Sequence, residues 1–419
     1  MQRISVLYGK GMLETAVDDA NLGQIIEPRF TQAADEIGEI RRALAQPIGS
    51  PRLKKLSRDI KKLVIISSDN TRPVPSRLTI PLLLEELYHE PEYYDITILI
   101  ATGLHREMTR EEIIERFGEK TASLCKIVNH RAQKEEELTY FGELSTGRPL
   151  WLNRLVAEAE LLIAEGFIEP HFFAGFSGGR KSILPGVAGA KTIMNNHCPA
   201  NIAHPRATIA CLEGNPIHLE ALEAACKSGL AFILNVALNQ EKRVIKAFAG
   251  HFDKAHMAGC AFVKEQMSVP TVLADIVITS NNGYPLDRNV YQLVKGMEVA
   301  SAAVRKGGVI VIAGDCIDGI GHGEFKRLIE ESPSIEELYA KVSSGEAVID
   351  QWQVQVFARV LKEHPVILVT DRLTKEEAGR IFLEHAATLE EALELAYRKV
   401  GRAARVNVIP EGPVVIPTV

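Results

Sequence analysis

Short apolar segments that each run into a polar loop constrain the fold of this chain most. Residues 63–67 and 96–100 are apolar runs of strand length, and residues 161–163 form a third. Helices are expected after the first two of these runs, at residues 80–87 and 110–116. Strands that alternate with helices are typical of parallel βαβ units. The sequence therefore predicts an α/β fold with mainly parallel sheets flanked by helices.

A second series of the same kind begins near residue 271. Apolar runs at residues 275–279, 308–312 and 365–369 each lead into polar residues. Before them, Ser268-Val269-Pro270 ends the preceding helical pattern, because a residue before proline avoids the helical region. This second series predicts a second, smaller sheet.

These patterns predict two α/β domains with the active site in the cleft between them. The N-terminal domain is expected at residues 1–270 and the smaller C-terminal domain at residues 271–400. Residues 401–419 are extended and Pro-rich, and we expect a tail that can fold back across the N-terminal domain. Residues 4–8 suit an edge strand, and residues 206–267 suggest helices and short connections.

Composition limits the class of protein. The chain has 419 residues, 46% hydrophobic and 24% charged, as an average soluble protein does. Its net charge of -6 argues against nucleic acid as a partner. It has no signal-like apolar run near the N-terminus and no stretch of 18 uncharged apolar residues, so we expect a cytoplasmic protein that does not bind a membrane. The six cysteines form no C-x-x-C pair and are expected to be free thiols.

Residues 166–197 concentrate the side chains that carry chemistry. Six glycines, at positions 166, 175, 178, 179, 186 and 189, prevent a long regular element and let the backbone approach a ligand. Among them stand basic residues and apolar ones: His171, Arg180, Lys181, Lys191 and His197, and Phe172, Phe173, Phe176, Ile183 and Leu184. A half-buried loop with histidine and lysine indicates a site, although a glycine-rich turn with incidental charges is the simpler alternative.

Two familiar motifs do not explain this segment. Gly-Gly-Arg-Lys-Ser at residues 178–182 resembles the end of a phosphate-binding P-loop. Counted from Gly175, however, Arg180 occupies the position of the second required glycine. The His-Glu-x-x-His pattern of zinc hydrolases is absent from the chain.

The three strands of the first series end in loops with functional side chains. Asp69 and Arg72 follow the first strand, His105 follows the second, and His171 and Lys181 follow the third. Ligands of open parallel sheets bind outside the carboxyl ends of the strands. We therefore expect the three loops to converge on one cleft.

With these residues in view, the chain resembles the nickel-pincer nucleotide-dependent lactate racemase family from end to end. The resemblance rests on DNTRP at 69–73, ATGLHR at 101–106, EPHFFAGFSGGRK at 169–181, Asn196-His197, YQLVK at 291–295, and Trp352. The four motifs between residues 69 and 197 occur in the same order, which makes chance agreement improbable.

The resemblance implies a covalent cofactor. In that family nickel is held by a pyridinium-3,5-bisthiocarboxylic acid mononucleotide, the nickel-pincer nucleotide, which is attached to a lysine through a thioamide. Matched motif by motif, Lys181 is the attachment lysine and His197 the nickel ligand; a phosphate-binding lysine and a core histidine are the alternatives. The set of further cofactor-binding residues comprises Asp69, Gly178, Gly179 and Arg180. A square plane of soft ligands suits Ni(II).

The resemblance also implies a reaction, the racemisation or epimerisation of a 2-hydroxy acid. His105 and His171 match the two acid/base histidines, and the chemistry is proton-coupled hydride transfer through a 2-keto acid intermediate. Imidazole can take or give a proton near neutrality. The expected substrate-binding residues are Arg72, Tyr291, Gln292, Lys295 and Trp352. Gln292 and Lys295, three apart on a helix, would face the same way.

Several roles stay open at the sequence level. Asp69 suits the orientation of a base or a ribose, or the N-cap of the following helix, while Tyr291 and Trp352 suit the pocket or the core. Cys198, beside the expected nickel ligand, suits a soft bystander ligand or a buried thiol.

The substrate and the protein partners stay open as well. Lactate, malate, longer or aromatic 2-hydroxy acids, and sugar acids are all compatible with these motifs. The family also implies cofactor-synthesis enzymes as partners, and a homo-oligomer stays open.

Two other classes of function remain at this stage. One is an oxidoreductase or lyase that uses a free nucleotide in the same cleft, and the other is a non-catalytic carboxylate-binding protein. The absence of Gly-x-Gly-x-x-Gly after an early strand argues against the first. Two acid/base histidines would be superfluous in the second.

Overall fold

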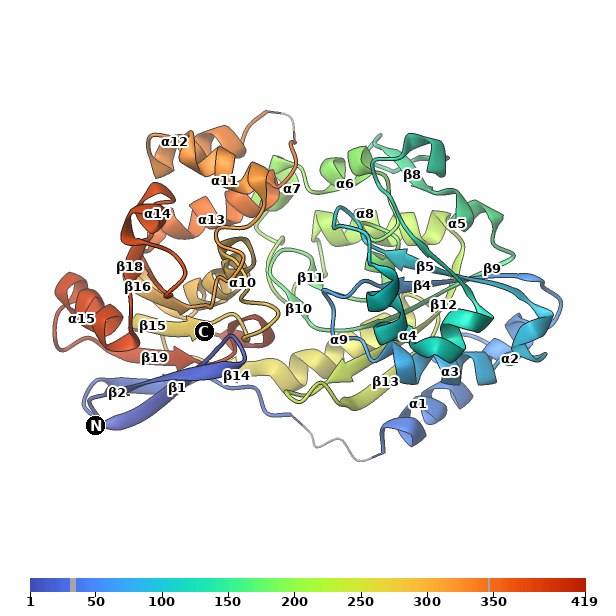
Figure 1. Cartoon of the computed structure of the whole chain (residues 1–419), viewed down its shortest axis with the longest axis horizontal. Coiled ribbons are helices and arrows are strands. Elements are labelled where there is room, and N and C mark those ends of the chain that lie inside the picture. Colours follow the sequence, from blue (N-terminus) through green and yellow to red (C-terminus); the bar gives the residue numbers. More distant parts are fainter. Residues whose placement is uncertain (31–34, 346) are drawn as a thin grey trace.

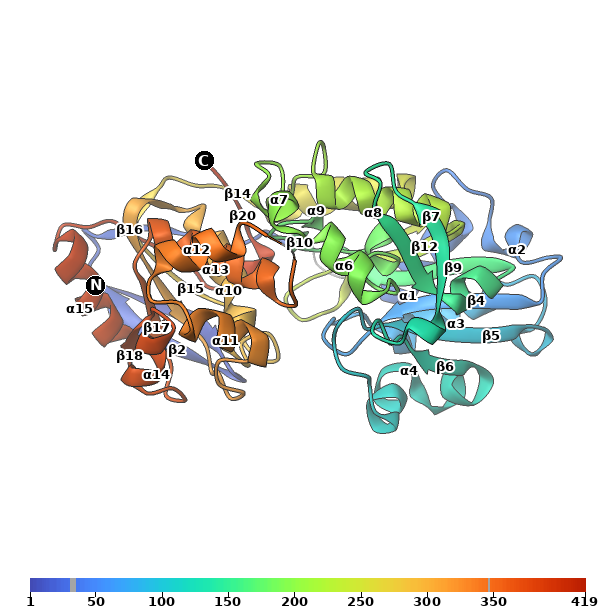
Figure 2. The same ribbon diagram turned by 90° about the horizontal axis from the view of Figure 1, so that it is seen from above.

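The computed structural model describes residues 1–30, 35–345 and 347–419. They form two lobes that lie side by side, each built on a six-stranded sheet with helices on its faces (Figures 1 and 2). The architecture is the predicted α/β fold with parallel sheets.

The first lobe contains the sheet with strand order β13-β12-β9-β4-β5-β6. Its strands are β4 (Lys62–Ser68), β5 (Asp95–Ala101), β6 (Lys126–Asn129), β9 (Leu161–Phe167), β12 (Leu230–Leu238) and β13 (Val244–Gly250). All neighbours are parallel except β12 and β13. The helices are α1 (Glu36–Ala45), α2 (Leu53–Leu56), α3 (Ser76–Glu85), α4 (Arg110–Leu124), α5 (Arg154–Glu158), α6 (Ala190–Asn196), α7 (Pro199–Ala203), α8 (Pro216–Lys227) and α9 (Lys254–Met267). Hairpins form from β7 (Leu138–Glu143) with β8 (Pro149–Asn153) and from β10 (Pro170–His171) with β11 (Gly175–Phe176).

Alternation along the strands divides the core of this lobe between the two faces of the sheet. In β4, Leu63 and Ile65 pack with α1, α3 and α4, whereas Val64 and Ile66 pack with α5, α6 and α8. Successive side chains of a strand point to opposite faces, so a strand covered on both sides is apolar throughout. This accounts for the unbroken apolar runs in the sequence.

The second lobe contains an entirely parallel sheet with strand order β18-β17-β16-β15-β19-β3. Its strands are β3 (Leu22–Ile25), β15 (Ala274–Ser280), β16 (Val304–Ala313), β17 (Val366–Val369), β18 (Glu384–Ala386) and β19 (Val406–Ile409). The helices are α10 (Val290–Ser301), α11 (Gly323–Glu330), α12 (Ile335–Val342), α13 (Gln351–Glu363), α14 (Lys375–Arg380) and α15 (Leu389–Val400). Short 3-10 helices lie at Pro91–Tyr93, Glu135–Glu137, Gly179–Ser182 and Gly412–Val414.

Both ends of the chain belong to the sheet of the second lobe. The hairpin of β1 (Gln2–Tyr8) and β2 (Gly11–Val17) packs against that sheet together with α15, and β3 pairs in parallel with β19 (Figure 1). The sequence assigned residues 1–26 to the N-terminal domain. In the structure β3 instead belongs to the sheet of the second lobe. The sequence did not show this, because a local pattern identifies a strand but not its partner.

The last residues likewise differ from a simple tail. Strand β19 lies inside the second sheet, between β15 and β3. Two short segments after it reach the first lobe. The 3-10 helix Gly412–Val414 contacts β10, and β20 (Ile416–Thr418) pairs with β14 (Ser268–Pro270), where Ile416 packs with Ile168 and Phe176. The extended C-terminal residues therefore contact both lobes.

Residues 206–267 contain two strands that the sequence did not reveal. Strand β12 lies beside β9 in the first sheet and β13 at its edge, where helices and short connections were expected. The sequence of β12, LAFILNVAL, is apolar almost throughout because both faces are covered. Such a run cannot be distinguished from a buried helix by periodicity.

One hydrophobic core joins the two lobes. Phe172, Phe173 and Ile202 from the first lobe pack with α10 and α13 of the second. Helix α7 contacts α13, where Gln355 donates to the carbonyl of Pro199 at 3.1 Å. Residues 172–173 and 199–202 are therefore packed between the lobes.

Two further properties concern the whole described chain. None of its helices is long and apolar enough to span a membrane. All six cysteines are free, as the absence of C-x-x-C pairs predicts.

Asn407 provides a test of how the N-terminal residues join the second lobe. It is fully buried, accepts a hydrogen bond from the Gln24 backbone at 2.9 Å and donates one to the Val272 carbonyl at 2.8 Å. We expect Asn407→Ala to lower the free energy of unfolding by about 2 kcal/mol, because both backbone groups lose their partner. Urea unfolding of Asn407→Ala beside Gln46→Ala, an exposed site, measures this. Equal small changes in both variants would contradict the expectation.

Candidate active site

A cleft of about 210 Å³ lies between the lobes at the carboxyl ends of the first sheet. Strands β9, β4 and β5 are neighbours, and the loops that follow them all contribute to its wall. The predicted site residues that line it are Asp69, Arg72, His105, His171, Gly178, Lys181, His197, Tyr291, Gln292, Lys295 and Trp352. The structure thus brings together residues that are almost 300 positions apart.

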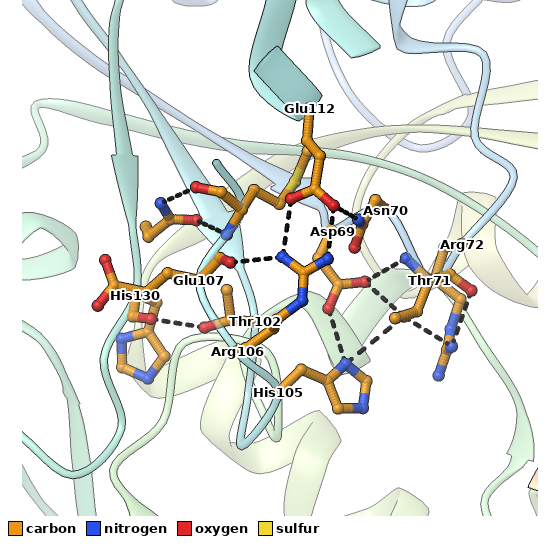
Figure 3. Close-up of polar contacts among 12 residues, drawn as sticks. Asp69, Asn70, Thr71, Arg72, Thr102, His105, Arg106, Glu107, Glu112 and His130 are labelled. Atoms are coloured by element: carbon orange, nitrogen blue, oxygen red, sulfur yellow. Dashed lines mark hydrogen bonds and ion pairs between the residues drawn. The ribbon is translucent and has the colours of Figure 1, made fainter. Parts of the chain in front are cut away.

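His105 and Asp69 form a hydrogen-bonded pair on the first-lobe wall (Figure 3). Asp69 Oδ2 lies 2.7 Å from His105 Nδ1, and Asp69 Oδ1 accepts from the backbone N–H of Thr71 at 3.0 Å. Because a carboxylate accepts, Nδ1 carries the proton and Nε2 is free to exchange one. Asp69 does not cap α3, whose N-cap is Pro75, and its carboxylate instead binds the His105 ring.

The environment keeps Asp69 ionised. Burial by itself would raise the pKa of this carboxyl group, but the hydrogen bond from His105, the charge on His105 and the charge on Arg72 outweigh it. Together they lower the pKa of Asp69 to about 2. The Asp69 carboxylate is therefore negatively charged where it faces the His105 ring.

A second contact fixes the loop that carries His105. Arg106 donates to both carboxylate oxygens of Glu112 in α4, and Asn70 donates to the same carboxylate at 2.7 Å (Figure 3). Arg106 is exposed, so this ion pair adds little stability. Its effect is geometric, because it ties the loops after β4 and β5 to one helix.

His171 and Lys181 face each other in the buried part of the cleft. His171 Nδ1 accepts from the backbone N–H groups of Phe173 and Ala174, at 3.5 and 3.3 Å, so the neutral ring carries its proton on Nε2. This Nε2 lies 3.3 Å from Lys181 Nζ. An N–H on the ring can donate only to an uncharged amine, so the geometry matches a neutral lysine.

The electrostatics of this pair agree with its geometry. Burial, and then the charges of Arg180, Arg72 and Lys295, hold the pKa of Lys181 well below its usual value. Burial and the neighbouring Lys181 likewise hold the pKa of His171 well below its usual value. Desolvation and like charge both disfavour the protonated forms.

His197 presents a nitrogen suited to a metal. It follows α6, and its Nδ1–H donates to the Ile193 carbonyl at 3.2 Å, which leaves Nε2 with a lone pair. Its ring packs edge-on against Phe173 and Trp352, one from each lobe. Burial lowers the pKa of His197 to about 3. The residue is therefore a neutral imidazole held by both lobes.

Helix α10 contributes the polar groups of the second-lobe wall. Lys295 Nζ donates to Gln292 Oε1 at 2.8 Å, which confirms that the two side chains share a face. Burial, and next the charge on Arg72, lower the pKa of Lys295 to about 7. Tyr291 and Trp352 are buried and line the same wall.

Gly179 and Arg180 do not line the cleft, although the resemblance assigned them to the cofactor. The Gly179 N–H donates to Asn235 Oδ1 at 2.8 Å, and a side chain there would collide with His256. The buried Arg180 guanidinium donates to the carbonyls of Ala174 and Gly178. Both residues hold the loop that carries Lys181. Gly178 does line the cleft, and its φ of 76° favours glycine.

Sequence reasoning missed two side chains of the second-lobe wall, His322 and Asp350. Each stands alone in the sequence, 28 residues apart, and neither belongs to a motif named above. The glycines at positions 319, 321 and 323 around His322 were the one available signal.

Comparison with known proteins identifies the family. A model of the lactate racemase N-terminal domain matches residues 8–210, and a model of the lactate racemase C-terminal domain matches residues 269–417. The lactate racemase of Thermoanaerobacterium thermosaccharolyticum is 46% identical over 99% of both chains. The chain belongs to the lactate racemase family. The lactate racemase of Lactiplantibacillus plantarum is 42% identical to it over 98% of this chain and 99% of its own.

Solved structures agree with this assignment. The lactate racemase apoprotein of T. thermosaccharolyticum superposes with a TM-score of 0.96 at 46% identity, and all of both chains is covered. A Thermotoga maritima protein gives a TM-score of 0.68 at 19% identity over 93% of this chain and 100% of its own, which shows a shared fold. Membership of the lactate racemase family makes this chain an isomerase of the racemase class.

The low pKa of Asp69 makes part of the stability depend on pH. This carboxyl titrates near 3.8 in the unfolded chain and at about 2 in the folded chain. The ionised carboxylate therefore contributes fully to the free energy of unfolding above the unfolded-chain pKa, and this contribution is lost as the pH falls through the folded-chain pKa. We expect the stability difference between the wild type and Asp69→Asn to shrink by about 1 kcal/mol between about pH 6 and pH 3. Urea unfolding at several pH values measures it. A constant difference would contradict the low pKa.

Proposed function

We propose that this chain racemises or epimerises lactate or a related 2-hydroxy carboxylate with a nickel-pincer nucleotide attached to Lys181. One observation carries the proposal: an uncharged, half-buried Lys181 amine lies in the same cleft as the free Nε2 of His197 and two histidines able to exchange protons. The curated relatives, which are lactate racemases, support the substrate class.

The residues present fit this cofactor. An uncharged amine is the form of lysine that makes a covalent bond, and the neutral imidazole of His197 is the form that binds a metal. Among the described residues no group of three or more His, Cys, Asp or Glu side chains could hold a metal ion. A nickel ion on His197 would therefore take its other ligands from the bound nucleotide. When bound, the pincer would supply sulfur and carbon ligands to nickel and a ring that accepts and returns a hydride.

Cationic side chains would bind and orient the substrate. Arg72 lines the cleft, and its guanidinium also donates to the Thr71 carbonyl and hydroxyl, at 3.2 and 3.1 Å. A planar guanidinium matches a carboxylate. Lys295 and Gln292 would add hydrogen bonds from the opposite lobe. These contacts would fix the C2 carbon between the two histidines.

His105 and His171 would move the hydroxyl proton. The Nε2 of His105 takes this proton from one enantiomer, and the Asp69 carboxylate stabilises the imidazolium that results. His171 would act from a different strand end: its Nε2 carries the proton, so it would donate this proton to the C2 oxygen as the other enantiomer forms. Because both rings keep Nδ1 fixed, each presents only Nε2 to the substrate.

The second lobe would exclude water from the reacting groups. Tyr291 and Trp352 cover the cleft from one side and Phe173 from the other, and all three side chains are buried. A dry site strengthens the electrostatic contacts to the substrate. It would also keep a transferred hydride from solvent.

Cofactor attachment can be tested by mass and metal content. We expect the protein, expressed together with the cofactor-synthesis enzymes, to carry an adduct of nucleotide size and about one nickel per chain. Lys181→Ala should lose both, since the anchoring amine is gone, and His197→Ala should keep the adduct and lose nickel. Lys191→Ala, an exposed lysine paired with Glu135, is the matched control and should keep both.

The outcome separates the proposal from its alternatives. If the wild type carries neither adduct nor nickel while a lactate racemase relative prepared in parallel carries both, the pincer proposal fails. An enzyme with a free nucleotide in the same cleft would then be the better hypothesis.

The fate of the hydrogen on C2 tests the type of chemistry. With lactate deuterated at C2, we expect the product enantiomer to keep the label, because the hydride that leaves C2 returns to the opposite face of the same molecule. Mass spectrometry of the product separated on a chiral column measures this. Exchange of the label with solvent would show instead that the histidines abstract the C2 proton.

A further inference from the structure

The proposed function leaves one histidine–aspartate pair of the cleft without a role. His322 Nδ1 lies 3.3 Å from both carboxylate oxygens of Asp350, and both residues line the cleft from the second lobe. The arrangement repeats that of His105 and Asp69 on the first-lobe wall, where a carboxylate also binds Nδ1. The cleft therefore contains two such pairs, one from each lobe.

The second pair is held in a fixed position. The His322 ring stacks on the ring of Tyr291, with centroids 4.0 Å apart and an interplanar angle of 19°. Asp350 is buried, and its backbone is in the left-handed region with φ of 65°. A non-glycine residue in this region is strained, and such strain concentrates at functional sites. Asp350 also stands at the N-cap of α13 without using its side chain as a cap, so the carboxylate is available to His322.

Hydrogen-bond assignment leaves one atom of the pair unused. Because the carboxylate accepts from Nδ1–H, His322 Nε2 is left without a hydrogen-bond partner among the described residues. The His322 side chain is 41% exposed, whereas Tyr291, Trp352 and His197 in the same cleft are buried. His322 thus stands at the open end of the cleft, and its free nitrogen is available to a ligand.

We propose that His322 is a specificity-determining residue that contacts the C3 end of the substrate. The inference rests on the proposed function and adds one element to it, namely that C3 of the bound acid extends toward the open end of the cleft, where His322 stands. A hydroxyl group on C3 can both donate and accept, so it pairs with Nε2 in either protonation state of the ring. The methyl group of lactate gives this nitrogen no partner. The preferred substrates are then 2,3-dihydroxy acids, of which glycerate is the smallest.

Substrate selectivity of the loaded enzyme tests this role. His322→Phe keeps a flat ring for the contact with Tyr291 and removes both nitrogens. We expect its ratio of kcat/KM for glycerate to kcat/KM for lactate to fall about tenfold, with the lactate value nearly unchanged, because one hydrogen bond is lost. His322→Gln restores a polar group and should recover most of the ratio. His204→Phe, at an exposed position after α7, should keep the wild-type ratio.

Two results would overturn the role of His322. One is an unchanged ratio in His322→Phe. The other is an equal loss for both acids in a variant whose thermal unfolding matches the wild type, because the pair would then act on both acids alike through Tyr291.

Binding without turnover separates this inference from the proposed function. Titration calorimetry of the chain without cofactor, with glycerate and with lactate, gives the same selectivity as a ratio of Kd values. Absence of racemisation by the loaded enzyme would reject the proposed function, and the Kd ratio would still decide on His322. Equal Kd ratios in the wild type and His322→Phe, or no glycerate binding by the wild type, would reject the inference.

Discussion

The crowding of basic groups in a buried cleft is the constraint on which the site depends. Arg180 is buried with no carboxylate partner in the part of the chain that the structure describes, and its guanidinium is held by the carbonyls of Ala174 and Gly178. Lys181 follows it directly, and Arg72 and Lys295 add positive charge. Several buried positive charges cannot coexist at low cost, so the group that can lose its proton does so. Arg180 thus stabilises the loop and at the same time keeps Lys181 uncharged.

The same loop is completed by the second lobe. The His197 ring contacts Phe173 of its own lobe and Trp352 of the second lobe, and α7 packs on α13. The position of His197 Nε2 therefore depends on interlobe packing as much as on the first sheet. This explains why the hydrophobic core that joins the lobes contains residues on both sides of the cleft.

Local sequence patterns predicted the parts of this structure that depend on local rules. Strand ends with Asp69, His105 and His171 identified the cleft, because parallel strands present their carboxyl ends at one edge. Strand β12 was missed, since an apolar run buried on both faces has no period. The motif that carries Lys181 did not show that Arg180 points away from the cleft, because adjacent residues of a tight turn can face opposite sides. Sequence patterns did not identify His322 for a different reason: its environment is set by Asp350, and only the fold brings the two residues together.

The pairing of β3 with β19 has a consequence for how the chain folds. The first lobe is one continuous stretch from α1 to α9, whereas the second takes strands from both ends of the chain. A ribosome delivers all of the first lobe, with Lys181 and His197, before the second sheet can close. Strand β3 cannot pair with β19 until some 380 further residues have been synthesised. Contacts between residues so far apart in the sequence also form slowly. The half of the site that anchors the proposed cofactor is thus made first, and the half that encloses the substrate is made last.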